Sequence, residues 1–218
     1  MIETIAGYWP GLMTIYIASF LGFVSPGPNF VVITAHAVKN RRAGAATALG
    51  VSFGTAIWVM LTSTGITTLL NAYEETTLMV GLVGGSYLCW LGVKSLRAAL
   101  SGTKFSDEFN KPSNAETSFS RAILTGLFIQ MSNPKAALFW IALSSLAIKP
   151  HTPSIVIIAM IIGCYAISLS WHMVLALVFS TGSIRQTYIS FKSLISAIFG
   201  TLFIGFGLKV IYAVIAGR

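Results

Sequence analysis

Long apolar stretches alternate with short polar segments along the whole chain. Six stretches reach the length of about 20 mainly apolar residues that a helix needs to cross the hydrocarbon core of a bilayer. Glycine, proline and small residues punctuate them, as is common in membrane helices, so we expect an all-α fold with six transmembrane helices. The predicted spans cover residues of about 11–37, 45–70, 78–97, 120–147, 154–180 and 194–215.

Composition supports a membrane protein. Hydrophobic residues make up 55% of the 218 residues and charged residues only 9%, whereas a soluble domain carries about 25% charged residues. So few charges cannot cover a surface that faces water, which excludes a soluble fold. The two cysteines, Cys89 and Cys164, stand alone in apolar stretches, which excludes a disulfide scaffold. We expect residues 1–218 to form a single transmembrane domain.

Basic residues concentrate in alternate loops. The formal net charge is +8, but the basic residues form no continuous stripe, so no nucleic-acid partner is expected. Lys39, Arg41 and Arg42 lie in the first loop, whereas the second carries Glu74 and Glu75. The third loop, at about 98–119, and the fifth are again basic. This bias places loops one, three and five in the cytoplasm and both termini outside.

The N-terminal stretch is expected to remain in the protein. No lysine or arginine precedes it, and no small-residue cleavage site follows. A basic residue before the apolar stretch and a small-residue cleavage site after it are the features of a secretory signal peptide. The first apolar stretch is therefore interpreted as a transmembrane helix.

The two halves of the chain share a pattern. Gly85 to Lys94 in the third span and Gly200 to Lys209 in the sixth place two glycines and a lysine at the same spacing. The first span of each half also carries proline near its middle. Three spans per half reverse the orientation of the second half, an arrangement shared by many secondary transporters. We predict an inverted repeat of about 8–97 and 120–218, joined by the cytoplasmic loop of about 98–119.

Prolines interrupt the first and fourth spans. Pro26 and Pro28 remove backbone donors and clash with the preceding turn, and Gly27 lets the chain bend. The freed backbone groups need protein or a wet cavity as partners, and a half-helix that begins there offers free N–H groups to a carboxylate. A structural kink is the alternative for either break alone. The predicted substrate-binding residues are Pro26, Gly27, Pro28, Asn29, Asn133, Pro134 and Lys135.

Lys135 is the charged residue nearest the middle of a predicted span. A charge at that depth costs roughly 2.5–3.5 kcal/mol on insertion scales, which makes it a functional candidate. Lys94 and Lys209 lie nearer helix ends, where snorkelling is the simpler interpretation. For His172, beside Trp171 in the fifth span, a hydrogen-bonded packing role is the simpler interpretation. A proton relay stays open because histidine titrates near neutral pH.

The acidic residues all lie outside the predicted spans. A metal or other cation exporter is therefore a weaker alternative, since no carboxylate, histidine and thiolate ligands are gathered at one depth. A zwitterionic amino acid fits better: Lys135 and half-helix starts bind its carboxylate, while carbonyls, hydroxyls or aromatic faces bind its ammonium. No nucleophile elbow, phosphate-binding loop or cofactor motif is present, so neither an enzyme nor a cofactor is expected. A non-transporting membrane component that binds a partner is the other alternative.

Three motifs together resemble the lysine exporter (LysE/RhtB) family, of the homoserine/threonine-exporter type. They are Ser25-Pro26-Gly27-Pro28-Asn29, the segment from Asn133 to Phe139, and the segment from Tyr87 to Arg97. The resemblance covers nearly the whole chain. It implies a multi-pass protein of the bacterial inner membrane that exports an amino acid, homoserine/threonine-like or otherwise neutral, driven by the proton gradient.

Two features leave the coupling site and the assembly open. Many family members place an acidic or histidine residue near the end of the glycine pair Gly50-x-x-x-Gly54, where this chain has Thr55 and Trp58. They also carry Pro-Gln-Phe where this chain reads Leu143 to Leu146. The Gly50/Gly54 pair permits close helix packing within one subunit or between two, so a homodimer is one alternative.

Overall fold

The computed structural model describes residues 2–25, 27–72, 76–100, 118–148 and 151–216. No strand occurs within these ranges, which confirms an all-α fold. The helices are α1 (Ile2–Val24), α2 (Pro28–Lys39), α3 (Arg41–Ala72), α4 (Thr76–Leu100), α6 (Phe119–Met131), α7 (Pro134–Ala147), α8 (Ser154–Phe179) and α9 (Gly182–Ile215).

Both predicted breaks are present. α1 ends at Val24 and α2 begins at Pro28, whereas α6 ends at Met131 and α7 begins at Pro134. Each proline occupies the first turn of a new helix, where its missing N–H group is not needed. Pro26, the other predicted breaker, lies outside the described residues.

The backbone at Gly27 does not use the conformational freedom of glycine. Its φ of −171° and ψ of −170° are those of extended backbone, which any residue adopts. Pro28 alone explains why α2 starts afresh, because proline cannot continue the preceding helix.

Within the described residues, four helices contain an apolar stretch long enough to cross a membrane: Gly7–Val24 in α1, Arg41–Gly65 in α3, Ser154–Phe179 in α8 and Ser193–Tyr212 in α9. The fourth predicted span does not qualify as one helix, because the break divides it into α6 and α7, whose apolar stretches are shorter. α9 begins at Gly182, well before the predicted boundary. The acidic pair Glu74 and Glu75, and residues 101–117 of the predicted connector, lie outside the described residues.

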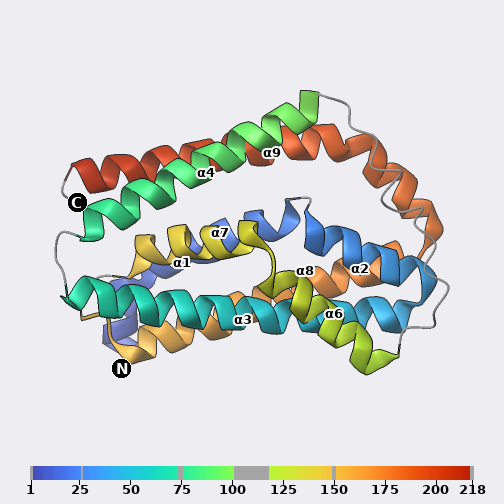
Figure 1. The fold of residues 1–218 in the computed structure, drawn as a ribbon, viewed down its shortest axis with the longest axis horizontal. Helices are drawn as coiled ribbons and strands as arrows, with labels where there is room; N and C mark the ends of the chain where they lie inside the picture. Colours follow the sequence, from blue (N-terminus) through green and yellow to red (C-terminus); the bar gives the residue numbers. More distant parts are fainter. Residues whose placement is uncertain (1, 26, 73–75, 101–117, 149–150, 217–218) are drawn as a thin grey trace.

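The helices form an elongated bundle in which successive passes run in alternate directions (Figure 1). α1 begins and α9 ends at the left end of the bundle in that view. At the opposite end, α2 leads into α3, α4 and α6 point toward residues 101–117, and α8 leads into α9. The junctions predicted to be cytoplasmic are therefore grouped at one end.

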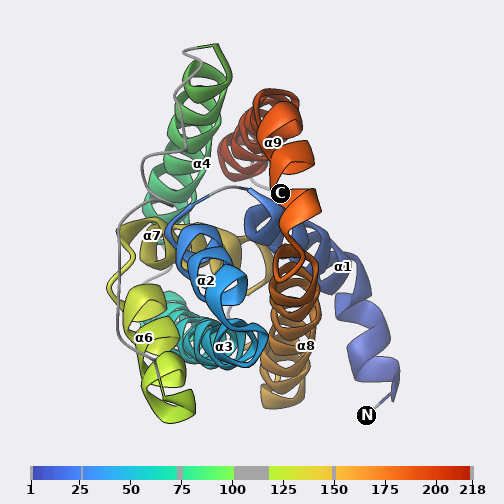
Figure 2. The ribbon, with the colours of Figure 1, turned by 90° about the vertical axis from the view of Figure 1, so that its right-hand side faces the viewer.

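The bundle has a middle layer that contains both breaks (Figure 2). α4 and α9 pack along each other on one side, and α3 packs against α6 and α8 on the other. Between them, α7 contacts α1, α3 and α4. The breaks thus lie between the α4–α9 pair and the layer of α3, α6 and α8.

The glycines of the two repeated motifs pack directly on each other. A Cβ added at Gly207 would lie 2.6 Å from the Gly85 carbonyl oxygen, and one at Gly200 would lie 2.8 Å from the Gly92 oxygen. A Cβ added at Gly50 would likewise collide with the Ile123 carbonyl oxygen of α6. These glycines therefore serve close helix contacts within one chain.

Two apolar clusters flank the breaks. One joins the first half of α1 to α7 and α8 and includes Ile15, Trp140 and Met160. The other joins α2 to the start of α3 and the end of α8 and includes Phe30 and Val51. The interrupted segments are held between these clusters.

Large apolar side chains also cover the outside of the helices, as expected of a lipid-facing surface: Ile17, Phe128, Ile162, Leu194 and Leu208 are examples.

Candidate functional site

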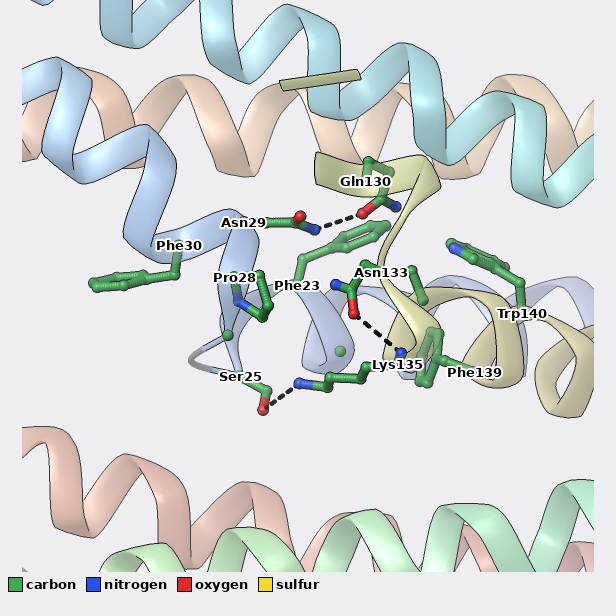
Figure 3. A pocket seen from close by; sticks show the side chains of 13 residues that line it. Phe23, Ser25, Pro28, Asn29, Phe30, Gln130, Asn133, Lys135, Phe139 and Trp140 are labelled. Carbon is green, nitrogen blue, oxygen red and sulfur yellow. Dashed lines mark hydrogen bonds between the residues drawn. The ribbon is translucent and has the colours of Figure 1, made fainter. Parts of the chain in front are cut away.

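Two hydrogen bonds join the breaks to each other (Figure 3). Lys135 Nζ donates to Ser25 Oγ over 3.2 Å, and Asn29 Nδ2 donates to Gln130 Oε1 over 2.6 Å. Each bond links a residue just before one break to a residue just after the other. The fold therefore joins two predicted site residues, Lys135 and Asn29, to partners more than a hundred positions away in the chain.

Lys135 is the second residue of α7, and its ammonium lies over the backbone of α2. A Cβ added at Gly27 would be 3.6 Å from Lys135 Nζ. An ammonium has three N–H donors, and the bond to Ser25 is the one that the described residues accept. Ser25 is neutral, so this bond leaves the charge uncompensated.

The start of α7 differs from the expectation. Asn133 Oδ1 accepts from the Lys135 backbone N–H at 3.0 Å, and the Asn133 carbonyl accepts from Ala136 and Ala137. The amides expected to be free for a carboxylate are therefore already bonded, because asparagine at an N-cap folds back onto its own helix. The positive group that remains is the Lys135 side chain. The start of α2, by contrast, has no side-chain cap.

Two cavities meet at Lys135. A small one, of about 40 Å³, lies against Phe23, Phe139 and Trp140, and a larger one, of about 450 Å³, runs along α4. The larger volume falls in the range typical of small-molecule pockets, roughly 300–1,000 Å³. Both are lined by Gly27, Pro28, Asn133 and Lys135. No acidic residue lines either cavity within the part of the chain that the structure describes.

Lys94 also lines the larger cavity, contrary to the snorkelling interpretation. Its ammonium lies 5.0 Å from the centre of the Trp90 ring, which stacks on Tyr87. A signal in the sequence could have identified this wall. Cavity-lining residues recur at the three- and four-residue spacing of one helix face: Tyr87, Trp90, Leu91, Lys94, Ser95 and Ala98.

Gln130 was overlooked in the sequence, although a glutamine inside an apolar stretch is itself a signal. Its side chain is 1% exposed. Gln130 makes two further hydrogen bonds besides the one to Asn29. Its Nε2 donates to Thr55 Oγ1 at 3.0 Å, and its backbone carbonyl accepts from Trp58 Nε1 at 3.0 Å. Thr55 and Trp58 are the residues noted above where many family members place an acidic residue or histidine. Both attach α3 to the break of the fourth span.

Near the first break, one polar acceptor has a protein partner and another does not. Trp171 Nε1 on α8 donates to the Phe23 carbonyl at 3.1 Å, near the end of α1. Asn29 Oδ1, in contrast, is buried without a hydrogen-bond partner. Leaving a buried acceptor unsatisfied costs about 1–3 kcal/mol, and such groups are few in native proteins.

A half-buried lysine between two helix breaks, facing cavities inside an apolar helical bundle, defines a membrane transport protein. The model of the LysE type translocator family matches residues 20–214. The chain therefore belongs to the LysE type translocator family.

Relatives match nearly the full chain. The threonine efflux protein of Escherichia coli K12 is 30% identical over 91% of this chain and 96% of its own length. The leucine efflux protein of Klebsiella pneumoniae is 28% identical over 91% and 93%. An uncharacterized membrane protein of Escherichia coli K12, YahN, is 31% identical over 90% and 86%. No solved structure matches the chain.

These comparisons confirm the family that the motifs resemble and its location in a membrane. The relatives are named for efflux, which supports the expectation that the chain is not an enzyme.

Proposed function

We propose that this chain is a secondary exporter of a small neutral amino acid, homoserine/threonine-like, across the bacterial inner membrane in exchange for protons. The observation that carries the proposal is the Lys135 ammonium, which faces two cavities between two helix breaks with a neutral hydroxyl as its partner. The relatives named for threonine and leucine efflux support the amino-acid class.

The proposed site binds the substrate carboxylate at Lys135 Nζ. The uncapped start of α2, at Gly27 and Pro28, adds the positive end of a helix dipole to the same cavities. The substrate ammonium faces hydroxyls, carbonyls and aromatic rings, as in the Tyr87–Trp90 wall. Asn133 and Pro134 belong to the proposed site because they shape its backbone. Pro26, outside the described residues, is kept in the proposed site for its place in the sequence between Ser25 and Gly27.

Contacts between helices support two inverted repeats, with boundaries at about 8–97 and 120–218. In such a repeat, α1, α2, α3 and α4 correspond to α6, α7, α8 and α9. The contact of α3 with α6 then corresponds to that of α8 with α1, and the contact of α3 with α7 corresponds to that of α8 with α2. The Gly85–Gly207 contact likewise corresponds to the Gly200–Gly92 contact. A pseudo-twofold relation accounts for all three pairs.

The larger cavity supports entry from the cytoplasm. It follows the second half of α4, from Tyr87 to Ala98, toward the end that leads into residues 101–117. Basic loops place that end in the cytoplasm. We therefore propose six spans with both termini outside and an inward-facing cavity.

Neither alternative gains support from the site. A cation exporter is disfavoured because the charged side chains that line the described cavities are Lys94 and Lys135. No group of histidine, cysteine, aspartate and glutamate that could hold a metal occurs among the described residues. The Gly50 contact is used within the chain, so it gives no reason to add a homodimer to the proposal.

The proposal is tested by loading cells with dipeptides and measuring which amino acid accumulates outside. Cells with the wild-type chain should release a small neutral amino acid faster than cells without it, and Lys135→Met at equal membrane abundance should not. Equal release of every amino acid with and without the protein would contradict the proposed function.

A further inference from the structure

A chain of buried hydrogen bonds leads from the first break to a histidine on α8. It starts at Asn29, passes through Gln130 to Thr55 on α3, and continues to Ser168, which lies 3.3 Å from Thr55 Oγ1. Ser168 Oγ lies 3.1 Å from His172 Nδ1. Gln130, Thr55, Ser168 and His172 are each at most 1% exposed. The chain joins four helices, and its members after Asn29 are buried.

The Phe23 ring touches His172 and also lines the site. The Phe23 ring lies 5.4 Å from the imidazole, centre to centre, and also lines the small cavity beside Lys135. Movement of Phe23 would therefore open the histidine to the same cavity that the substrate reaches. Phe23 directly precedes the first break, where a helix end has fewer backbone bonds to hold it.

No charged side chain among the described residues makes a hydrogen bond or ring contact with His172. Its partners in the described structure are Ser168 and the Phe23 ring. α8 and the helices packed against it carry other titratable or charged side chains among the described residues. None of these makes a hydrogen bond or ring contact with His172: Tyr8, Tyr16, His36, Lys39, Arg41, Arg42, Cys164, Tyr165, Lys209 and Tyr212. A proton that enters this ring therefore changes the local charge without a neighbour to compensate it.

We propose that His172 takes up the proton that is exchanged for the substrate, and that Ser168, Thr55 and Gln130 transmit its charge state to Asn29 at the break. This inference rests on the proposed function as a proton-coupled exporter. It assigns the coupling to α8 and leaves the substrate carboxylate to Lys135.

The Ser168 hydroxyl links the charge state of His172 to the hydrogen bonds of α3. It carries one hydrogen, which is placed to donate to Thr55 Oγ1 and Ser52 Oγ, at 3.3 Å each. A neutral imidazole can accept that hydrogen at Nδ1, whereas an imidazolium donates at both ring nitrogens. Protonation of His172 thus turns the Ser168 hydrogen toward α3, where Ser168 and Gln130 share Thr55 as acceptor. The Gln130 and Asn29 amides keep their donor directions, but Thr55 Oγ1 then accepts from both Ser168 and Gln130, and no proton passes through the Gln130 amide.

The test uses the full chain, purified and reconstituted in liposomes, with the amino acid identified by the release assay as labelled probe. Two processes are compared: exchange of labelled for unlabelled substrate at equal pH, and accumulation driven by a pH gradient. A one-to-one exchange for protons gives roughly tenfold accumulation per pH unit, which is 1.4 kcal/mol. His172→Asn keeps a polar atom near the position of Nδ1 but does not titrate.

His172→Asn should retain exchange within about threefold, lose the pH dependence of exchange and show an accumulation ratio near one. Cys164→Ser, a buried change two turns earlier on α8, should accumulate like the wild type. Wild-type accumulation by His172→Asn overturns the inference. Loss of both exchange and accumulation at normal abundance also overturns it, because the histidine would then be needed for binding or structure.

Ser168→Ala provides a second variant in case His172→Asn does not fold. It leaves the titrating ring in place but removes the link to α3, so exchange should persist while accumulation falls toward a ratio of one. Undiminished accumulation by Ser168→Ala would overturn the inference independently. A wild-type chain that exchanges no amino acid contradicts the proposed function itself, and the inference falls with it.

Discussion

Lys135 Nζ donates a hydrogen bond to Ser25 Oγ across 110 residues of sequence, over 3.2 Å. The bond holds an ammonium from the second half of the chain against the end of the first helix. A hydroxyl satisfies one donor but does not neutralise the charge, and a buried charge without a counter-ion is costly. An incoming carboxylate would supply that counter-ion, so the empty site is suited to its proposed ligand.

Lys135→Met should insert and fold but lose export. The substitution removes a partly buried charge at similar volume, while a hydrogen bond to a charged group, of about 1.5–3 kcal/mol, is lost from substrate binding. Release should fall at least about tenfold, measured beside membrane abundance. Lys209→Met, at an exposed lysine of the repeated motif, is the control. Normal release by Lys135→Met would remove this lysine from the mechanism.

Gly27 should tolerate alanine but not leucine. The backbone there is extended, and a Cβ would make an ordinary contact of 3.6 Å with Lys135 Nζ. A leucine side chain would instead enter the space around the ammonium. Release by Gly27→Ala should stay near the wild-type rate, and release by Gly27→Leu should be lost at similar abundance. Equal activity of the two variants would show that this space does not receive substrate.

Gln130→Leu should destabilise the junction between the breaks. It leaves Asn29 Nδ2 without its acceptor and removes one of the two donors to Thr55 Oγ1 inside a buried region. We expect a loss of about 1–3 kcal/mol in stability, seen as a lower midpoint of thermal unfolding in detergent. Thr125→Leu, at an exposed hydroxyl earlier on α6, should leave the midpoint nearly unchanged. An unchanged midpoint for Gln130→Leu would contradict the structural role given to this bond.

Gly207→Ala should weaken the packing of α9 on α4. Its Cβ would lie 2.6 Å from the Gly85 carbonyl oxygen, so the two backbones must separate, and such overpacking typically costs about 1–3 kcal/mol. The matched control is Gly205→Ala on the same helix, where nothing lies within 4 Å of the added Cβ. Replacing that helical glycine should stabilise slightly. Thermal unfolding of the two variants should therefore shift in opposite directions.

Cysteine labelling should place Ser154 and Ser120 on opposite sides of the membrane. Both are exposed, at the starts of α8 and α6. In a chain with Cys89 and Cys164 replaced, a membrane-impermeant reagent added outside should label Ser154→Cys but not Ser120→Cys. Disruption of the cells should make both reactive. Labelling of Ser120→Cys in intact cells would reverse the proposed orientation.

The sequence by itself determined the fold class and the two breaks. Apolar length and the low charge content require helices whose backbone groups are satisfied internally. Pro28 and Pro134 interrupt two of these helices whatever surrounds them, because proline cannot continue a helix. The family motifs are likewise local, and the family comparison confirms them.

Only the tertiary structure decided which groups meet at the breaks. Capping by Asn133, the place of Lys94 on the cavity wall, and the links from Gln130 to Thr55 and Trp58 depend on how separate helices pack. Periodicity shows which face of a helix a residue occupies, but not which helix lies opposite that face. The Lys135–Ser25 bond joins two segments whose distance in space no local pattern contains, and it exists because the two halves of the bundle pack against each other.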